Sequence, residues 1–583
     1  MPKEKKPDSG VKATPYPTAD HARFTPLVVD DDEIRTTGTG ASPAPVPRYL
    51  GPAKIETAAS PYVDVRVGIP ETPGGNNHMR RQVALSPTGT VHMVYGVIAG
   101  FSTASDSDKN FLYFYNAYNC SGSGTLEFGS LDVQMAAPGP PADPRPRVMN
   151  QGGIFILPNT SLPIAYGNQY ILRTETPQGG DLSRRPLMMM RDSVECLGLF
   201  FRADSIFFSP PPGSITIHWV MYPLNESTWV GTCRPNSNPS DIGWTYTTDR
   251  GASWTAVAIL PTWSPWFNSV DITGAGNTVY VVSHADPNDP GAFTTTERPC
   301  YLKGIYEPAT GSLTWGTITD ITGDFELPNY LSNMLGVSAL MIGDTLHLMW
   351  TDWNGEYGYA PTGVPGGHVH HVAVQPDGTV QGPHKIADIN INGGLPNRSY
   401  SLFGFSVNNW PFVSLSYNPN TGVLYGLWSQ PPDDGAFGWA DYEQYGALAC
   451  YDIFCSASPN NGRGWDDAQN VTQTNNPGCD GSVGDPCHHE DYFVSAEIAD
   501  SVVNVVAMVQ RYPGVQETAV RSGISPDPGP FTETRDVFRL YRVPARAPVP
   551  TIRAVLAVSA ADTTKLETVS LRPRDAATSV NMR

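Results

Sequence analysis

The sequence predicts an all-β protein built as a propeller, and three observations carry this prediction. The 583-residue chain contains 56 Gly and 55 Pro and has no long segment with helical periodicity. A strand–turn–strand pattern recurs along much of the chain, and an eight-residue turn pattern ending in Trp occurs twice. Such patterns are typical of short antiparallel strands joined by tight turns.

The eight-residue pattern runs hydroxyl residue, any residue, Asp or Asn, any residue, Gly, two further residues and Trp. It occupies residues 247–254 and again residues 458–465, each time between strand-like flanks. We expect the Asp or Asn side chain to hydrogen-bond its own turn, the Gly to take a conformation that other residues resist, and the Trp to pack underneath. These structural positions are Asp249, Gly251 and Trp254 in the first copy and Asn460, Gly462 and Trp465 in the second. The pattern therefore marks a fold rather than a chemistry, unless the two copies are unrelated polar turns.

The strand–turn–strand repeat sets the number of sheets. Its equivalent points are Val91, Val279, Leu346, Val423 and Val503, and the last four are separated by 67, 77 and 80 residues. Each of these intervals is long enough for one four-stranded blade with generous loops. Weaker strand candidates at residues 162–166 and 215–222 divide the longer first interval. We therefore predict six or seven four-stranded blades, with seven slightly favoured.

Composition divides the chain into three segments. Residues 1–75, rich in Pro, Thr and Gly, predict an extended N-terminal arm that is either a disordered leader or docks along a neighbouring subunit. Residues 76–543 hold the propeller. Residues 544–583 begin as a Pro-rich linker, and two strand-like stretches follow. These stretches either pair as a terminal hairpin, or one of them completes the first blade.

Charge and cysteine content limit the partners and the compartment. The net charge of −19 disfavours nucleic acid and anionic membranes. No stretch is long and apolar enough to insert into a membrane, and residues 1–10 lack the apolar core of a signal peptide. Eight Cys fit either disulfides or buried thiols. Cys450 and Cys455 are too far apart on one strand to bridge, whereas Cys479 and Cys487 could close a flexible loop.

The two turns and the strand pattern resemble the Asp boxes and bacterial neuraminidase (BNR) repeats of the sialidase-type propellers. The resemblance covers roughly residues 78–543 and implies a propeller. That superfamily includes glycoside hydrolases, lectin-like binders and scaffold proteins, so the fold does not choose the function. The resemblance, together with long loops rich in Gly, Pro and Asn, favours an extracellular or particle-surface location.

The resemblance also implies where a catalytic set would lie. Sialidases of this type share an Arg-Ile-Pro motif on the first strand, an acid Asp in a following loop, a Tyr nucleophile paired with Glu, and two further Arg that clamp the substrate carboxylate. Matching positions here are Arg81, Asp106 and Tyr400. Such chemistry needs a protonated carboxylic acid to donate to the leaving oxygen, a nucleophile on the opposite side of the sugar, and cationic groups that bind the sugar carboxylate bidentately. The Ile-Pro is missing after Arg81, and no further clamp Arg stands in a recognisable motif, so an exo-acting glycoside hydrolase of sialidase type is the alternative hypothesis.

Histidines and acidic loops are the candidate metal ligands. His368, His370 and His371 lie on one predicted strand, where alternation places the first two on one face. Strand histidines without a companion motif usually serve in packing, so we expect no metal site. The acidic loops at residues 286–289 and 480–491 could hold a structural calcium ion, although neither has diagnostic spacing. We expect no other cofactor.

Tryptophan-rich loops favour binding. Four tryptophans lie in predicted loops, namely Trp263, Trp266, Trp410 and Trp439. If exposed, their rings offer flat apolar platforms and indole donors to sugars or protein partners, whereas the alternative is that they pack between blades. We therefore expect a non-catalytic recognition or structural module on a surface or in a larger assembly. Its partners would be a glycan or a protein, and neighbouring subunits through the N-terminal arm.

Overall fold

The computed structural model consists of strands, turns and connections. It describes residues 62–66, 72–73, 81–99, 110–120, 133–134, 136–137, 147–171, 187–192, 194–197, 200–201, 216–235, 242–260, 270–285, 298–321, 331–353, 366–390, 413–430, 444–445, 448–449, 452–474, 490–499, 502–510, 537–544, 552–557 and 566–571. These residues contain no helix, and so none that could cross a membrane.

The chain divides into two compact units. One unit is Tyr49–Arg546, and the other combines the two chain ends, Met1–Arg48 and Ala547–Arg583. In the unit of the chain ends, β33 (Ile552–Ala557) pairs with β34 (Leu566–Leu571) as an antiparallel hairpin. Of the two alternatives for the C-terminal segment, the structure has the hairpin.

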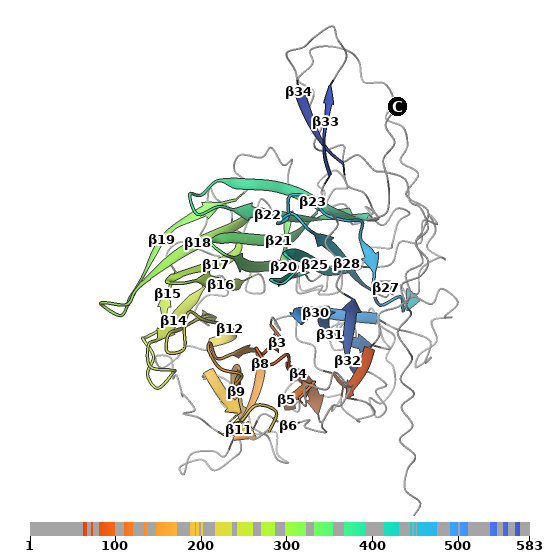
Figure 1. Cartoon of the computed structure of the whole chain (residues 1–583). Coiled ribbons are helices and arrows are strands. Elements are labelled where there is room, and N and C mark those ends of the chain that lie inside the picture. The colour runs from red at the N-terminus through yellow and green to blue at the C-terminus, as the bar shows by residue number, and fades with distance from the viewer. Residues whose placement is uncertain are drawn as a thin grey trace, which may run out of the picture. The chain divides into compact units, whose positions relative to one another are not determined.

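Within the described part of the larger unit, the strands form seven sheets of four or five strands, which we number as blades in chain order (Figure 1). Blade 1 consists of β2 (Thr72–Pro73), β3 (Val83–Leu85), β4 (Val91–Ala99), β5 (Asn110–Tyr118) and β6 (Val133–Gln134). Blade 2 consists of β7 (Ala136–Ala137), β8 (Arg147–Ile156), β9 (Pro163–Ile171), β10 (Leu187–Asp192) and β11 (Phe200–Phe201). Blade 3 consists of β12 (Thr216–Pro223), β13 (Trp229–Pro235), β14 (Gly243–Thr247) and β15 (Ala258–Ile259).

Blade 4 consists of β16 (Asp271–Ala275), β17 (Thr278–Ala285), β18 (Arg298–Glu307) and β19 (Ser312–Asp320), and blade 5 of β20 (Leu331–Ile342), β21 (Thr345–Trp353), β22 (Gly366–Val374) and β23 (Val380–Asn390). Blade 6 consists of β24 (Val413–Asn418), β25 (Val423–Gln430), β28 (Asp452–Ser458) and β29 (Gln469–Asn470). Blade 7 consists of β30 (Glu490–Ala499), β31 (Val502–Gln510), β32 (Val537–Pro544) and β1 (Tyr62–Arg66). A separate small hairpin pairs β26 (Gln444–Tyr445) with β27 (Leu448–Ala449).

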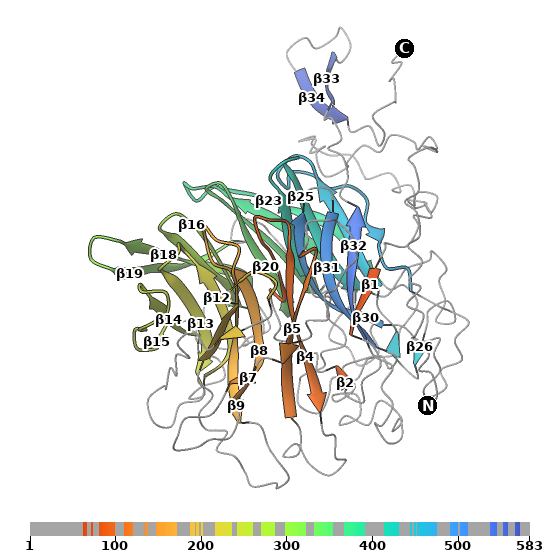
Figure 2. The ribbon, with the colours of Figure 1, turned by 60° about the horizontal axis from the view of Figure 1, so that its bottom comes forward.

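The first strands of the blades close into a ring. Contacts join β3 to β8, then to β12, β16, β20, β24 and β30 in turn, and β30 contacts β3 again. Figure 2 shows successive blades standing side by side. A closed ring of antiparallel sheets is a propeller, so the predicted fold is confirmed. The number of sheets lies within the predicted range.

A strand from the N-terminal region completes the last blade. β1 pairs with β32, and the ring of Tyr62 lies 5.5 Å from that of Tyr541 and 4.1 Å below the guanidinium of Arg539. β2 likewise pairs with β4 of blade 1. The segment predicted as an arm, residues 1–75, therefore contributes two strands to the propeller. Because β1 is the edge strand of blade 7, segments from the two ends of the propeller sequence are hydrogen-bonded within one sheet.

The meander gives the propeller two faces. Short turns join first strands to second strands at one end of the blades, which we call the turn face. In blades 1 to 6 the connection from the third to the fourth strand lies at the same end, whereas the fourth strand of blade 7 is β1 from the N-terminal region. Connections from second to third strands, and from one blade to the next, leave and enter at the opposite end, which we call the loop face.

The hydrophobic core lies in the seams between blades. Six clusters of buried residues are described, and each combines side chains of two adjacent blades. In β9, Ile164 and Tyr166 face blade 3, whereas Ala165 between them faces blade 1. This is the two-residue alternation of a strand buried on both faces.

Candidate functional site

Arg81, the sequence-predicted catalytic arginine, lies just before β3 at the inner edge of blade 1. It has a φ of 59°, and its carbonyl accepts a hydrogen bond of 2.9 Å from the backbone N–H of Ile154 in blade 2. Its Nε donates to Oδ1 of Asp271 at 3.3 Å, and its Nη2 donates to the carbonyl of Ile272. Because both acceptors belong to blade 4, the side chain reaches past blades 2 and 3.

Asp271 connects three blades through one buried carboxylate. The residue is only 4% exposed, and its Oδ2 accepts a hydrogen bond of 2.8 Å from the backbone N–H of Ala339 in blade 5. The guanidinium of Arg81 supplies the opposite charge and also lies 5.8 Å from the centre of the Tyr222 ring. A buried carboxylate without such partners would be costly. The Arg81–Asp271 ion pair is therefore a structural contact between blades 1 and 4.

The other candidate residues lie outside the described part of the chain. These are Asp106 and Tyr400 of the catalytic set and Trp263, Trp266, Trp410 and Trp439 of the binding set. The convergence of Arg81, Asp106 and Tyr400 stays a prediction. The acidic loop at residues 286–289 also lies outside, as does nearly all of the loop at residues 480–491.

The flanking strands nevertheless assign each of these residues to one of two kinds of connection. Asp106 falls between β4 and β5, and Trp439 between β25 and β28, which are connections from second to third strands. Trp263 and Trp266 fall between β15 and β16. Tyr400 and Trp410 fall between β23 and β24, so these four belong to connections between blades. All the strand ends involved lie on the loop face.

The first tryptophan turn, residues 247–254, joins β14 to β15 on the turn face. Thr247 Oγ1 donates to Oδ1 of Asp249 at 2.7 Å and accepts from the N–H of Gly251 at 2.9 Å. The Asp249 carboxylate also accepts hydrogen bonds from the N–H of Ser253 at 2.8 Å and from its hydroxyl. Slight desolvation opposes ionisation of this exposed residue, but the bonds from Ser253 and Thr247 outweigh it and lower the pKa of Asp249. Trp254 Nε1 donates to the carbonyl of Gly251 at 3.1 Å.

The second tryptophan turn, residues 458–465, joins β28 to β29 and so occupies the same position in blade 6. Ser458 Oγ donates to Oδ1 of Asn460 at 2.9 Å and accepts from the N–H of Gly462 at 2.8 Å. Gly462 has a φ of 79°, close to the 87° of Gly251 in the first turn. The indole N–H of Trp465 is buried and has no hydrogen-bond partner among the described residues.

Two histidines lie beneath the second turn. His371 of β22 and His347 of β21 are buried, and their Nε2 and Nδ1 atoms are 3.1 Å apart. Burial lowers the pKa of His347 to about 4 and that of His371 well below its usual value, so both are neutral at pH 7. The neighbouring His370 faces the other side of β22, with its ring 5.4 Å from that of Trp350. Both described histidines of the sequence cluster therefore pack in the core, and the side chain of His368 lies outside the described part.

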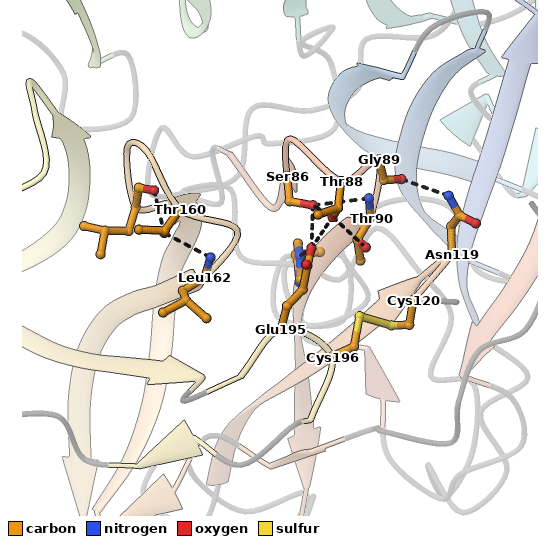
Figure 3. A network of polar contacts seen from close by, with 12 residues as sticks. Ser86, Thr88, Gly89, Thr90, Asn119, Cys120, Thr160, Leu162, Glu195 and Cys196 are labelled. Atoms are coloured by element: carbon orange, nitrogen blue, oxygen red, sulfur yellow. Dashed lines mark hydrogen bonds and ion pairs between the residues drawn. A yellow bond between two sulfur atoms is a disulfide. The ribbon is translucent and has the colours of Figure 1, made fainter. Parts of the chain in front are cut away.

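A polar network between blades 1 and 2 was missed by the sequence analysis (Figure 3). Glu195 Oε1 accepts hydrogen bonds from Ser86 Oγ at 2.6 Å and Thr88 Oγ1 at 2.5 Å. His92 Nε2 lies 3.4 Å from the same oxygen, and His92 Nδ1 lies 2.6 Å from the hydroxyl of Tyr115. Although burial opposes it, hydrogen bonds from His92 and the hydroxyls lower the pKa of Glu195, and burial raises that of Tyr115.

A disulfide joins the same two blades. Cys120, just after β5, is bonded to Cys196, 76 residues further on, with their Cα atoms 5.7 Å apart. No sequence motif predicts this disulfide or the Glu195 network, because the partners are more than 70 residues apart in sequence. Cys455 is a buried thiol, whereas Cys450, Cys479 and Cys487 lie outside the described residues. In the part of the chain that the structure describes, no three His, Cys, Asp or Glu side chains gather as a metal site.

Comparisons with solved structures give matches at low identity. A polysaccharide lyase, an ulvan lyase bound to a -[GlcA(1-4)Rha3S]- ligand, is 8% identical with a TM-score of 0.40 over 82% of this chain and 96% of the other. An α-L-arabinanase of Penicillium chrysogenum is 10% identical with a TM-score of 0.33 over 70% and 97%. A protein of unknown function from Dyadobacter fermentans is 9% identical with a TM-score of 0.34 over 82% and 99%. No protein-family model and no curated protein sequence matches the chain.

Proposed function

We propose that this chain is a non-catalytic propeller of the Asp-box, sialidase-type superfamily. It binds carbohydrate or a protein partner through its loop face, on a surface or in a larger assembly. The two tryptophan turns support the superfamily assignment, since both join the third strand to the fourth strand of a blade. The hydrogen bonds within each turn and the packing of its Trp against a seam between blades favour a structural role over a role in binding.

One observation carries the proposed binding face. The four tryptophans singled out in the sequence occur in three separate connections, and the strands that flank all three end at the loop face. Indole rings in loops at one end of a ring of blades can together form a platform for sugar rings or a protein surface. The turn face differs, because the tryptophans of the two eight-residue turns, Trp254 and Trp465, pack against the seams between blades.

Arg81 has structural partners within the propeller. Its Nε donates to Asp271 and its Nη2 donates to the carbonyl of Ile272, so the Nε–Nη2 edge of the guanidinium is occupied. A substrate carboxylate would therefore have to bind at the Nη1–Nη2 edge. Removing Arg81 would leave the buried Asp271 without its cation, at a cost of about 3 kcal/mol or more, which gives this residue a structural role in either function.

A glycan array probed with the purified full-length chain tests the binding proposal. We expect retention of at least one class of glycan, and a loss of affinity of about tenfold for Trp263→Ala, Trp410→Ala or Trp439→Ala. Ile305→Ala is the matched control, because Ile305 is an exposed apolar residue in β18, outside the loop face. Equal losses for the control, or retained binding in all three tryptophan variants, would count against a loop-face site. If no glycan binds, a pull-down with the same variants tests for a protein partner, and light scattering tests for assembly.

A panel of fluorogenic sialosides tests the alternative. We expect no turnover. Turnover that disappears in both Arg81→Ala and Tyr400→Phe would instead establish the exo-acting glycoside hydrolase. Because Arg81→Ala also removes the partner of Asp271, its folding must be checked by circular dichroism before the activity is compared.

A further inference from the structure

The turn at residues 194–197 is held to the rest of the propeller by two adjacent side chains. The turn belongs to blade 2, and the N–H of Leu197 donates to the carbonyl of Val194 at 3.1 Å. Its two central residues are Glu195 and Cys196, and Cys196 has a φ of 61°. Glu195 is bound by hydroxyls of blade 1, and Cys196 is bonded to Cys120 of blade 1.

The remainder of this turn buries little apolar surface. Val194 is 55% exposed and Leu197 is 47% exposed, so the hydrophobic effect contributes little to holding the turn in place. Among the described residues, the turn is held by the Glu195 hydrogen bonds, by the disulfide and by packing of Cys196 against the apolar cluster of blades 1 and 2. Cys120 is itself exposed, which makes the bond accessible to a small molecule in solution.

The carboxylate of Glu195 in turn orders groups of blade 1. It accepts the hydroxyl hydrogens of Ser86 and Thr88 in the turn between β3 and β4 (Figure 3). It also lies 3.4 Å from Nε2 of the buried His92. A carboxylate gains from such bonds only while it is held at hydrogen-bond distance. The covalent bond one residue away supplies that constraint, because it limits how far the turn can move.

We propose that Cys120–Cys196 is a thiol-reactive site, at which a low-molecular-weight thiol releases the 194–197 turn and so frees the Ser86–Thr88 turn from Glu195. A thiolate attacks Sγ of Cys120, the Sγ–Sγ bond breaks, and Cys196 leaves as a thiolate that takes up a proton. A second thiolate then attacks the mixed disulfide and releases Cys120. The protein gains two electrons and two protons, and the two small thiols become one disulfide. This inference does not depend on the proposed binding function.

Hydrogen exchange on the oxidised full-length chain, with and without reduced glutathione or dithiothreitol, tests the proposal. We expect amides in peptides covering residues 86–92 and 194–197 to exchange about tenfold faster or more after reduction. Peptides covering the two tryptophan turns should keep their rates, and reoxidation should restore the slow exchange. Alkylation without denaturant, followed by peptide mapping, should label Cys120 and Cys196 and leave the buried Cys233, Cys300 and Cys455 unlabelled.

Two variants sharpen the test. The Cys120→Ser/Cys196→Ser double variant should exchange like the reduced protein and should no longer respond to thiol. Glu195→Gln, which keeps the disulfide, should release the 194–197 turn less than reduction does. The proposal is overturned if reduction leaves exchange in these peptides unchanged, if it accelerates exchange in every blade, or if Glu195→Gln alone matches the effect of reduction.

Discussion

The two tryptophan turns share a backbone and differ in what supports them. Both join third and fourth strands, and both use a hydroxyl oxygen to accept the N–H of a glycine with positive φ. In the first turn these polar groups are hydrogen-bonded within the turn itself, since Asp249 accepts from Ser253 and the indole N–H of Trp254 donates to the carbonyl of Gly251. The second has Gly464 where the first has Ser253, and its Trp465 indole N–H is buried without a partner among the described residues.

Support for the second turn comes from the neighbouring blade. The ring of His371 lies 5.1 Å from that of Trp465, at an interplanar angle of 65°, and His371 bonds His347 behind it. The first turn has Trp254 packed against an apolar cluster of blades 2 and 3. The shared sequence pattern thus determines the backbone conformation of the turn. The stability of each turn depends on the side chains that pack against its Trp, and these differ between the two copies.

The largest effect should come from a methyl group at Gly462. A Cβ built there lies 1.9 Å from Cε1 of His371, and the φ of 79° is unfavourable for alanine. We expect Gly462→Ala to lower the free energy of unfolding by about 3–5 kcal/mol, measured by urea denaturation. Gly378→Ala is the matched control, because Gly378 has a φ of 87° and open space around its Cβ position, and it should cost only about 1–2 kcal/mol.

A double-mutant cycle separates the clash from the backbone strain. His371→Ala should remove most of the excess cost of Gly462→Ala, since the contacting ring is then absent. Equal costs at Gly462 and Gly378, or costs that add independently with His371→Ala, would mean that His371 does not set the tolerance of the second turn.

The second turn should be the more sensitive to acid. The folded pKa of His347 is about 4, below the usual 6.5, so the unfolded chain binds the proton more readily. Stability is fully present above pH 6.5 and is lost as the pH falls toward 4, by about 2 kcal/mol at pH 5. The lowered pKa of Asp249 keeps that carboxylate ionised throughout this window. Urea denaturation at pH 7 and pH 5 should show the loss in the wild type and a smaller one in His347→Leu. The same loss in both proteins would assign the acid sensitivity elsewhere.

Sequence reasoning recovered what local chemistry encodes. The Asp or Asn, Gly and Trp positions of the two turns and the repeated strand–turn–strand units were readable because their residues lie within about a dozen positions of one another. The Arg81–Asp271 pair and the Glu195 network were not readable, since their partners are 190 and 109 residues apart. Such contacts depend on which blades the closed ring brings together. The His368–His371 cluster illustrates the same limit, because the partner of His371 is His347 on another strand.

Removing the indole N–H should affect the two turns differently. In Trp254→Phe the carbonyl of Gly251 loses a donor, which should cost about 1 kcal/mol beyond the smaller ring. In Trp465→Phe a buried N–H without a partner disappears, and the relief of about 1 kcal/mol offsets part of the lost packing. We therefore expect Trp465→Phe to be the milder variant by about 1–2 kcal/mol in urea denaturation. A milder Trp254→Phe would mean that the indole of Trp465 has a partner in solution, such as a bound water.

The smallest effect should come from the residue that distinguishes the two motifs. Ser253 is exposed, and its hydroxyl donates to Asp249, whereas its backbone N–H also bonds that carboxylate. Ser253→Ala removes only the hydroxyl bond, so we expect a loss of about 0.5 kcal/mol in urea denaturation. It should also raise the pKa of Asp249 toward its usual value, which NMR titration of the carboxyl carbon can follow. The second turn forms without any hydroxyl at this position. A decrease in the free energy of unfolding above about 1.5 kcal/mol in Ser253→Ala would therefore contradict our view that backbone hydrogen bonds and apolar packing are enough to support the first turn.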